Sequence, residues 1–209
     1  MSTLTVVDHP LLQHKLSLMR CKETDSPRFR QLMREASCLI GYEVTRDLTL
    51  EARAVETPLT TAEANFLADE KPVLIPILRA GNGMLDGMLD LLPRASVGHL
   101  GLRRDPDTLR PSEYYFNAPG DLHDRLVVVL DPTLGTAGSA NAAVSRLKAA
   151  GAQRIRMVCL LTCPEGIQAF RGAHPDVPLY TAAVEGSLDS HGYLVPGVGD
   201  VGDRLHGTT

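Results

Sequence analysis

The chain has 209 residues, a formal net charge of −4 and 44% hydrophobic residues, which predicts one folded domain over residues 1–209. The acidic balance and the lack of a basic run argue against nucleic-acid or membrane-surface partners held by long-range electrostatics. No apolar run reaches the roughly 18 residues of a membrane span, and the first residues lack the features of a signal peptide. We therefore expect a cytoplasmic protein.

The first half of the chain predicts a core helix followed by strand, helix and strand. In residues 28–44, RFRQLMREASCLIGYEV, apolar side chains recur at helical spacing opposite charged ones. The run VLIPIL at 73–78 predicts a buried strand, and GMLDGMLDLL at 83–92 predicts a helix that ends before Pro93. A further strand is expected at about 96–102.

Segment 102–124 follows, with three prolines and two adjacent tyrosines. Long segments without a periodic pattern are uncommon in compact domains unless they serve as lids or arms. We therefore expect a protruding arm at about 102–124.

The second half of the chain alternates strands and helices. RLVVVL at 125–130 leads through the loop DPTLGTAG into the helical SANAAVSRLKAAG and the strand RIRMVCLL at 154–161. A helix at 164–173 and a strand at 178–184 continue the alternation. The pattern predicts an α/β fold with a mostly parallel sheet flanked by helices, and a site at the carboxyl ends of its strands.

The loop at 131–139, DPTLGTAGS, follows the central apolar strand directly. Its small residues leave backbone N–H groups open to a ligand, and the helix that follows adds the positive end of its dipole. Thr133, Thr136 and Ser139 can donate hydroxyls, whereas an ionised Asp131 can only accept, which suits sugar hydroxyls. The loop lacks the lysine of an ordinary nucleoside-triphosphate loop. We expect a phosphorylated sugar here, with a merely tight turn as the alternative.

The loop LRAGNGM at 78–84 also follows a predicted strand and places Arg79 at the turn. The forked guanidinium of an arginine can pair with two phosphate oxygens at once. Arg104, at the start of the expected arm, is a further candidate for the same anion. A surface arginine beside a helix-starting glycine is the alternative for Arg79.

The segment PGVGDVGDR at 196–204 contains the pattern GxGxxG at Gly197, Gly199 and Gly202. The match to a dinucleotide site is weak, because such a site needs a strand before it, a helix after it and an acidic residue about 20 positions further on. Glycines do expose main chain that can hydrogen-bond the edge of a flat ligand. We expect a planar ligand at the C-terminal segment, about 190–209.

Taken in order, these motifs resemble the uracil phosphoribosyltransferase family, which has the type I phosphoribosyltransferase fold, over essentially the whole chain. VVVLDPTLGTAGSA resembles its phosphoribosyl-diphosphate motif, ILRAGNGM its diphosphate loop, GLRRDPDTLRPSEYY its arm and GYLVPGVGDVGDR its uracil loop. The pair Asp131 and Pro132 is telling, because most phosphoribosyltransferases carry two acidic residues there.

The resemblance implies that uracil and 5-phospho-α-D-ribose 1-diphosphate are converted to UMP and diphosphate, a step of pyrimidine salvage. The residues then expected to be catalytic are Arg79, Arg104 and Asp131. Donor binding is expected at Arg79, Arg104, Asp131, Pro132, Thr133, Leu134, Gly135, Thr136, Ala137, Gly138, Ser139 and Asp200. Uracil binding is expected at Leu194, Gly199, Asp200 and Val201.

The resemblance also implies Mg²⁺ as the cofactor, held mainly by substrate oxygens and water rather than by protein side chains. It implies a homodimer or higher homo-oligomer, and it makes GTP a candidate effector.

Three residues depart from the family pattern. Ala137 stands where the family has the second residue of TGGS, Asn82 interrupts LRAGLGM, and Val201 ends a triplet that usually reads GDA. Two alternatives therefore stay open: a phosphoribosyltransferase for another nucleobase, and a non-catalytic regulator that binds phosphoribosyl diphosphate.

Overall fold

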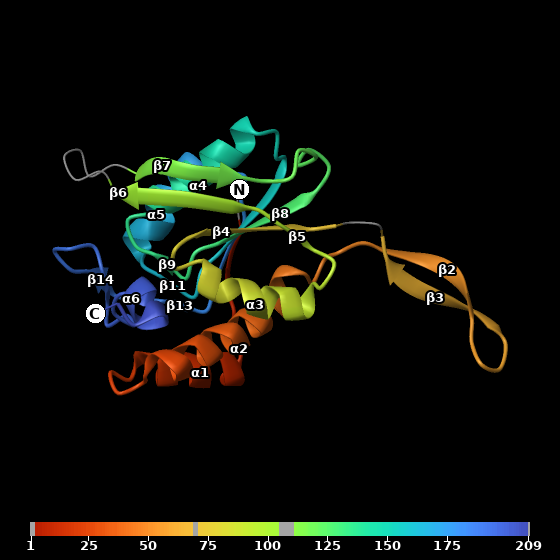
Figure 1. Ribbon diagram of the computed structural model, residues 1–209, viewed down its shortest axis with the longest axis horizontal. Coiled ribbons are helices and arrows are strands. Elements are labelled where there is room, and N and C mark those ends of the chain that lie inside the picture. The colour runs from red at the N-terminus through yellow and green to blue at the C-terminus, as the bar shows by residue number, and fades with distance from the viewer. Residues whose placement is uncertain (1–2, 69–70, 105–110, 209) are drawn as a thin grey trace.

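The computed structural model describes residues 3–68, 71–104 and 111–208, and Figure 1 shows a central sheet with helices on both faces. All neighbouring strands of the eight-stranded main sheet pair in parallel except β6 and β7, which are antiparallel. The sheet confirms the predicted fold class. In spatial order its strands are β1 (Leu4–Val6), β12 (Leu179–Thr181), β10 (Arg154–Val158), β8 (Leu126–Leu130), β4 (Val73–Leu78), β6 (His99–Arg104) and β7 (Pro111–Asn117), with β5 (Ser96–Val97) paired to β4.

Two layers of helices cover the sheet. One layer holds α1 (Pro10–Arg20), α2 (Ser26–Val44), α3 (Asn82–Leu91) and the short α6 (Val201–His206), and the other holds α4 (Gly138–Ala149) and α5 (Pro164–Ala173). The side chains of β8 alternate between the two cores: Val128 packs among the first layer, and Val127 and Val129 pack among the second. A strand buried on both faces must be apolar throughout, which explains the uninterrupted run LVVVL.

The predicted helices and strands of the sheet are present within a few residues. Helix α2 begins at Ser26, two residues before its periodic pattern, because the Asp25 carboxylate accepts a hydrogen bond from the backbone of Arg28 at 2.9 Å and Pro27 fits the first turn. None of the helices in the described ranges is both long and apolar enough to cross a bilayer.

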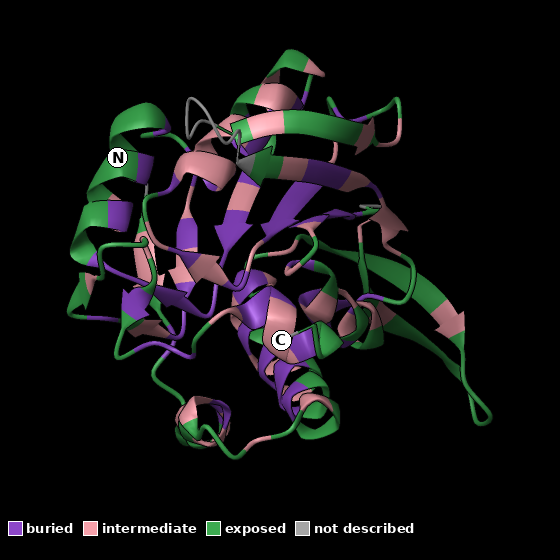
Figure 2. Cartoon of the chain, turned by 60° about the vertical axis from the view of Figure 1, so that its left-hand side comes forward, coloured by how far each residue is buried: buried purple, intermediate pink, exposed green. Residues whose placement is uncertain are grey.

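A hairpin that the sequence analysis did not predict projects from the body of the molecule. Among the described strands, β2 (Leu50–Glu56) and β3 (Thr61–Leu67) pair only with each other, and both are exposed along most of their length (Figures 1 and 2). Helices α1 and α6 were also not predicted. Alternation in LEARAVE and TAEANFL was the available signal, but both faces of the hairpin meet solvent, so hydrophobic patterning is weak.

Part of the expected arm is regular structure. β6 continues to Arg104, and β7 returns beside it as the antiparallel edge of the main sheet. Residues 105–110, between the two strands, lie outside the described residues. Residues 111–117 form an exposed edge strand, which shows too few buried positions to give a clear alternation in the sequence.

Two small sheets lie at the edge where the main strands end. β9 (Thr133–Leu134), β11 (Leu161–Thr162) and β13 (Ala183–Val184) form a parallel sheet, and β14 (Ser187–Leu188) pairs with β15 (Leu194–Val195). They bring residues 133–134 and residues 183–195 to the same side of the molecule.

Candidate functional site

The site forms where the order of strands reverses in the main sheet. β4 leads through α3 to β5 and β6 on one side, whereas its neighbour β8 leads through α4 to β10 on the other. Pro76 pairs with Leu130, so Arg79 and Asp131 follow neighbouring strand ends. A crevice at such a reversal is the usual ligand site of open α/β sheets.

A cavity of about 330 Å³ lies over these strand ends. It is lined by Arg79 and Asp131, by every residue of the loop 133–139, and by the segment 191–193. Helix α4 begins at this cavity and has no side-chain hydrogen bond at its N-cap, Ala137. Its first-turn N–H groups therefore remain available to an anion, with the positive end of the helix dipole behind them.

A second cavity of about 230 Å³ adjoins the first. The C-terminal segment supplies most of its wall, including Leu194, Gly199, Asp200 and Val201. The two cavities share six lining residues: Arg79, Ala80, Thr133, Gly135, Gly192 and Tyr193. The three loops singled out in the sequence therefore meet around one continuous space.

Pro132 is the residue of the expected donor loop 131–139 that does not line the first cavity. Pro132 is buried beneath its loop, where its carbonyl oxygen accepts hydrogen bonds from the backbone of Leu160 and Leu161 at 2.9 and 3.1 Å. Its structural contribution is to fasten the loop rather than to line the cavity. The side chain of Arg104 lies outside the described residues.

Asp131 is the half-buried carboxyl of the first cavity. Burial raises its pKa to about 7, and a hydrogen bond from the backbone of Thr133 acts in the opposite direction. At neutral pH the carboxyl is therefore divided between its two protonation states. A ligand hydroxyl that donates to the carboxylate would favour the ionised form.

Asp200 is held by two hydrogen bonds at the wall of the second cavity. It caps α6 by accepting from the backbone of Asp203 at 2.9 Å, and it accepts from the Tyr193 hydroxyl at 3.0 Å. The hydrogen bond to Asp200, together with the charge of that carboxylate, raises the pKa of Tyr193. Tyr193 was not among the predicted site residues, although it lies in the GYLVPGVGDVGDR motif.

Arg79 is positioned between the two cavities with its side chain 58% exposed. One guanidinium nitrogen lies 3.3 Å from an oxygen of Asp203, which also accepts from the Thr208 hydroxyl at 2.5 Å. Most donors of this guanidinium fork remain open to a ligand.

The departures from the family pattern fall at three different kinds of position. Ala137 has φ 61° and ψ 8°, the left-handed conformation that favours glycine, and the following N–H groups belong to α4. Val201 is buried and lines the second cavity at the start of α6. Asn82 is exposed and lines neither cavity.

Residues 3–68, 71–104 and 111–208 contain no group of three or more His, Cys, Asp or Glu side chains arranged to hold a metal ion. In the first cavity, the oxygen donors are the Asp131 carboxyl and the hydroxyls of Thr133, Thr136 and Ser139. This set suits Mg²⁺, which usually binds one or two protein carboxylates and completes its shell with substrate phosphate oxygens and water.

The whole chain matches a known family. The family model described as uracil phosphoribosyltransferase matches residues 6–208. The chain belongs to the uracil phosphoribosyltransferase family. It is 58% identical over 208 residues to uracil phosphoribosyltransferase from Alkaliphilus oremlandii and 56% identical to that from Rhizobium leguminosarum bv. trifolii, with 100% of both chains covered in each case.

Solved structures share the fold of this chain. The AQ2163 protein from Aquifex aeolicus superposes with a TM-score of 0.94 and 33% identity, with 99% of each chain covered. A purine phosphoribosyltransferase from Pyrococcus horikoshii gives a TM-score of 0.50 at 17% identity, covering 73% of this chain and 82% of that one. The second likeness supports the fold alone.

Replacing Ala137 by glycine should stabilise the protein. The left-handed conformation costs an alanine about 1 kcal/mol, which a glycine avoids. Urea unfolding of Ala137→Gly should therefore show a higher midpoint. The matched control is Ala142→Gly within α4, which should lose about 0.5–1 kcal/mol because glycine weakens a helix interior. Destabilisation of both variants would contradict the backbone explanation.

The burial of Asp131 predicts a pH-dependent difference in stability. Its pKa is about 7 in the folded protein and about 3.9 in an unfolded chain. At a pH between these two values, the folded protein keeps the proton on Asp131 and the unfolded chain has lost it. The free energy of unfolding therefore falls as the pH rises, and the contribution of Asp131 to stability is lost by about pH 7. Asp131→Asn lacks this titrating group. The free energy of unfolding of the variant should therefore increase relative to that of wild type as the pH is raised from 5 to 8. A difference independent of pH would contradict the raised pKa.

Proposed function

We propose that this chain transfers the phosphoribosyl group of 5-phospho-α-D-ribose 1-diphosphate to N1 of uracil, forming UMP and releasing diphosphate. The observation that carries the proposal is the pair of adjoining cavities, one at an open helix N-terminus and one walled by glycine-rich main chain. Family membership supports the choice of uracil.

In the proposed complex, the first cavity takes the donor. The 5-phosphate meets the N–H groups and hydroxyls of residues 133–139, and Asp131 accepts from the ribose hydroxyls. Arg79 and Arg104 pair with the diphosphate. Asp200, on the wall of the second cavity, is proposed to face both the donor and the base.

The reaction moves charge, and the proposed roles follow that movement. As the bond from C1 to the diphosphate oxygen lengthens, positive charge grows on the ribose and negative charge on the leaving group. Fixed cations at the leaving group stabilise the transition state more than the ground state. Arg79, at the junction of the two cavities, is suited to this role.

Mg²⁺, bound mainly through substrate oxygens and water, would neutralise the diphosphate and help it to leave. The arm at about 102–124 is proposed to close over the donor and exclude water, since an exposed oxocarbenium-like centre would be hydrolysed.

Uracil selection is proposed to come from main-chain atoms. The edge of uracil presents acceptor, donor and acceptor, which a backbone loop at 199–201 can match. Cytosine would set an amino group against a backbone N–H and leave buried groups unpaired, a cost of up to about four orders of magnitude in specificity. The buried Val201 is compatible with this readout because its backbone, rather than its side chain, makes the pairing.

A homodimer or higher homo-oligomer is proposed for the protein. The projecting hairpin supports it, because Leu59 is 95% exposed and Phe66 and Leu67 are 39% and 51% exposed. GTP is retained as a candidate effector on the strength of the family resemblance.

Measuring diphosphate release tests the proposed activity. Purified protein is incubated with the sugar diphosphate, Mg²⁺ and one nucleobase at a time. We expect release with uracil and only background release with cytosine, adenine, guanine or hypoxanthine. Turnover with a purine would favour the other-nucleobase alternative, and binding of the donor with no turnover of any base would favour the regulator.

Removing the Arg79 guanidinium should slow the reaction. We expect Arg79→Ala to lower kcat/KM by roughly tenfold or more, because each decade corresponds to about 1.4 kcal/mol of lost transition-state stabilisation. The matched control is Arg94→Ala, the same change of charge at an exposed residue that lines neither cavity. Equal kinetics in both variants would exclude the proposed role.

A further inference from the structure

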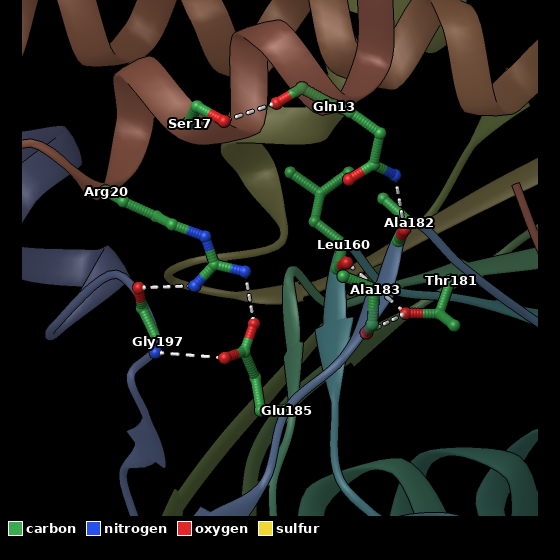
Figure 3. A network of polar contacts seen from close by, with 9 residues as sticks. All are labelled: Gln13, Ser17, Arg20, Leu160, Thr181, Ala182, Ala183, Glu185 and Gly197. Carbon is green, nitrogen blue, oxygen red and sulfur yellow. Dashed lines mark hydrogen bonds and ion pairs between the residues drawn. The ribbon is translucent and has the colours of Figure 1, made fainter. Parts of the chain in front are cut away.

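Two side chains hold the loop of the second cavity at a single residue, Gly197. Gly197 has φ 58°, and a Cβ at this position would lie 2.0 Å from the carbonyl oxygen of Leu194, so only glycine fits. Both of its backbone polar groups are bound by side chains (Figure 3). Its N–H donates to Glu185 Oε2 at 3.3 Å, and its carbonyl accepts from Arg20 Nη1 at 2.9 Å.

The two side chains that bind Gly197, those of Arg20 and Glu185, also bind each other. Arg20 Nη2 donates to Glu185 Oε1, so each carboxylate oxygen and each terminal guanidinium nitrogen has its own partner in the network. The Glu185 side chain is 3% exposed and that of Arg20 is 29% exposed. A buried carboxylate is stable only when its charge and lone pairs are satisfied, so the geometry of the three residues is mutually dependent.

Glu185 also connects this loop to the opposite wall of the site. Its backbone N–H donates to the carbonyl of Thr162 at 2.6 Å, and the Thr162 hydroxyl donates to the carbonyl of Leu134 at 2.9 Å. Leu134 belongs to the loop that lines the first cavity. Glu185 therefore lies at the joint between the two loops that the proposed reaction must hold together.

We infer that Glu185 and Arg20 are positioning residues for the nucleobase: by fixing Gly197 they set the main chain of 199–201 to bind uracil. Neither residue lines the first or second cavity, so they act through the loop rather than by contact. The inference rests on the proposed function, because it assigns the second cavity to the base.

Two substitutions disrupt the hydrogen bonds that hold Gly197 while preserving most of the side-chain volume. Glu185→Gln replaces one carboxylate oxygen by an NH₂ group, which cannot accept from Arg20 or Gly197. Arg20→Lys keeps the charge but has a single nitrogen in place of the fork, so it cannot hold Glu185 and the Gly197 carbonyl in the same geometry.

The matched control is Glu35→Gln. Glu35 pairs with Lys15 at 2.5 Å and joins the same helix α1 to α2, but neither residue of the pair lines the described cavities of the site. The control therefore removes an ion pair of α1 without touching the loop at 196–204.

The experiment measures kinetics and hydrogen–deuterium exchange on all three variants. In Glu185→Gln and Arg20→Lys we expect the KM for uracil to rise by roughly tenfold, as for the loss of one charge-assisted hydrogen bond. The KM for the sugar diphosphate should stay within about twofold of wild type, because residues 131–139, which supply most of its expected contacts, are intact. In the ligand-free protein, exchange should increase at residues 194–202 and remain unchanged at 131–139. Glu35→Gln should match wild type in all four measurements.

Combining the two substitutions gives a further check. Both residues act by holding Gly197. The KM for uracil of the double variant should therefore be little higher than that of the more affected single variant. Fully additive effects would overturn the shared mechanism.

The possible failures are distinguishable. If both variants keep wild-type exchange at 194–202 and a wild-type KM for uracil, the inference is overturned. Equal increases in both KM values, or faster exchange throughout the chain, would show a general structural role and would also overturn it. If wild type does not use uracil, the proposed function fails. Exchange in the ligand-free variants then still decides whether Glu185 and Arg20 hold the loop at 194–202.

Discussion

Parallel pairing of β4 with β8 is the constraint on which the site depends. The two strands lead into helices on opposite faces of the sheet, and this divergence leaves a crevice that no side chain of the core fills. The strand ends alone do not complete a site for two substrates. The small β9–β11–β13 sheet and the C-terminal segment close the crevice by bringing a third length of main chain to its rim.

Because much of the site is backbone, its accuracy depends on what holds the backbone. Pro132 ties the donor loop to residues 160–161 through its carbonyl. On the other side, the half-buried guanidinium of Arg204 donates to the carbonyls of Val198, Cys21 and Thr24 at distances of 3.0, 2.7 and 3.1 Å and lies 4.4 Å from the centre of the Phe29 ring. The C-terminal loop is thus fastened to the connection between α1 and α2.

The sequence predicted the elements whose signal is local. The apolar run LVVVL indicated a strand buried on both faces, and so predicted the sheet. Glycines indicated main chain open to a ligand in the loops at 78–84, 131–139 and 196–204. The β2–β3 hairpin was missed because its alternating residues meet solvent on both faces. Arg20 and Glu185 were missed for a different reason: they are 165 positions apart, and no spacing rule relates them. The left-handed conformation of Ala137 was hidden because alanine gives no hint of it.

The most direct test of the central claim is a crystal structure of the protein with UMP, which joins the phosphorylated sugar and the base in one molecule. The account predicts that the phosphate oxygens lie against the backbone N–H groups of residues 135–139, and that the uracil ring lies in the adjoining cavity against the main chain of 199–201. UMP bound in another cavity, or held by its phosphate with the base turned out to solvent, would contradict it.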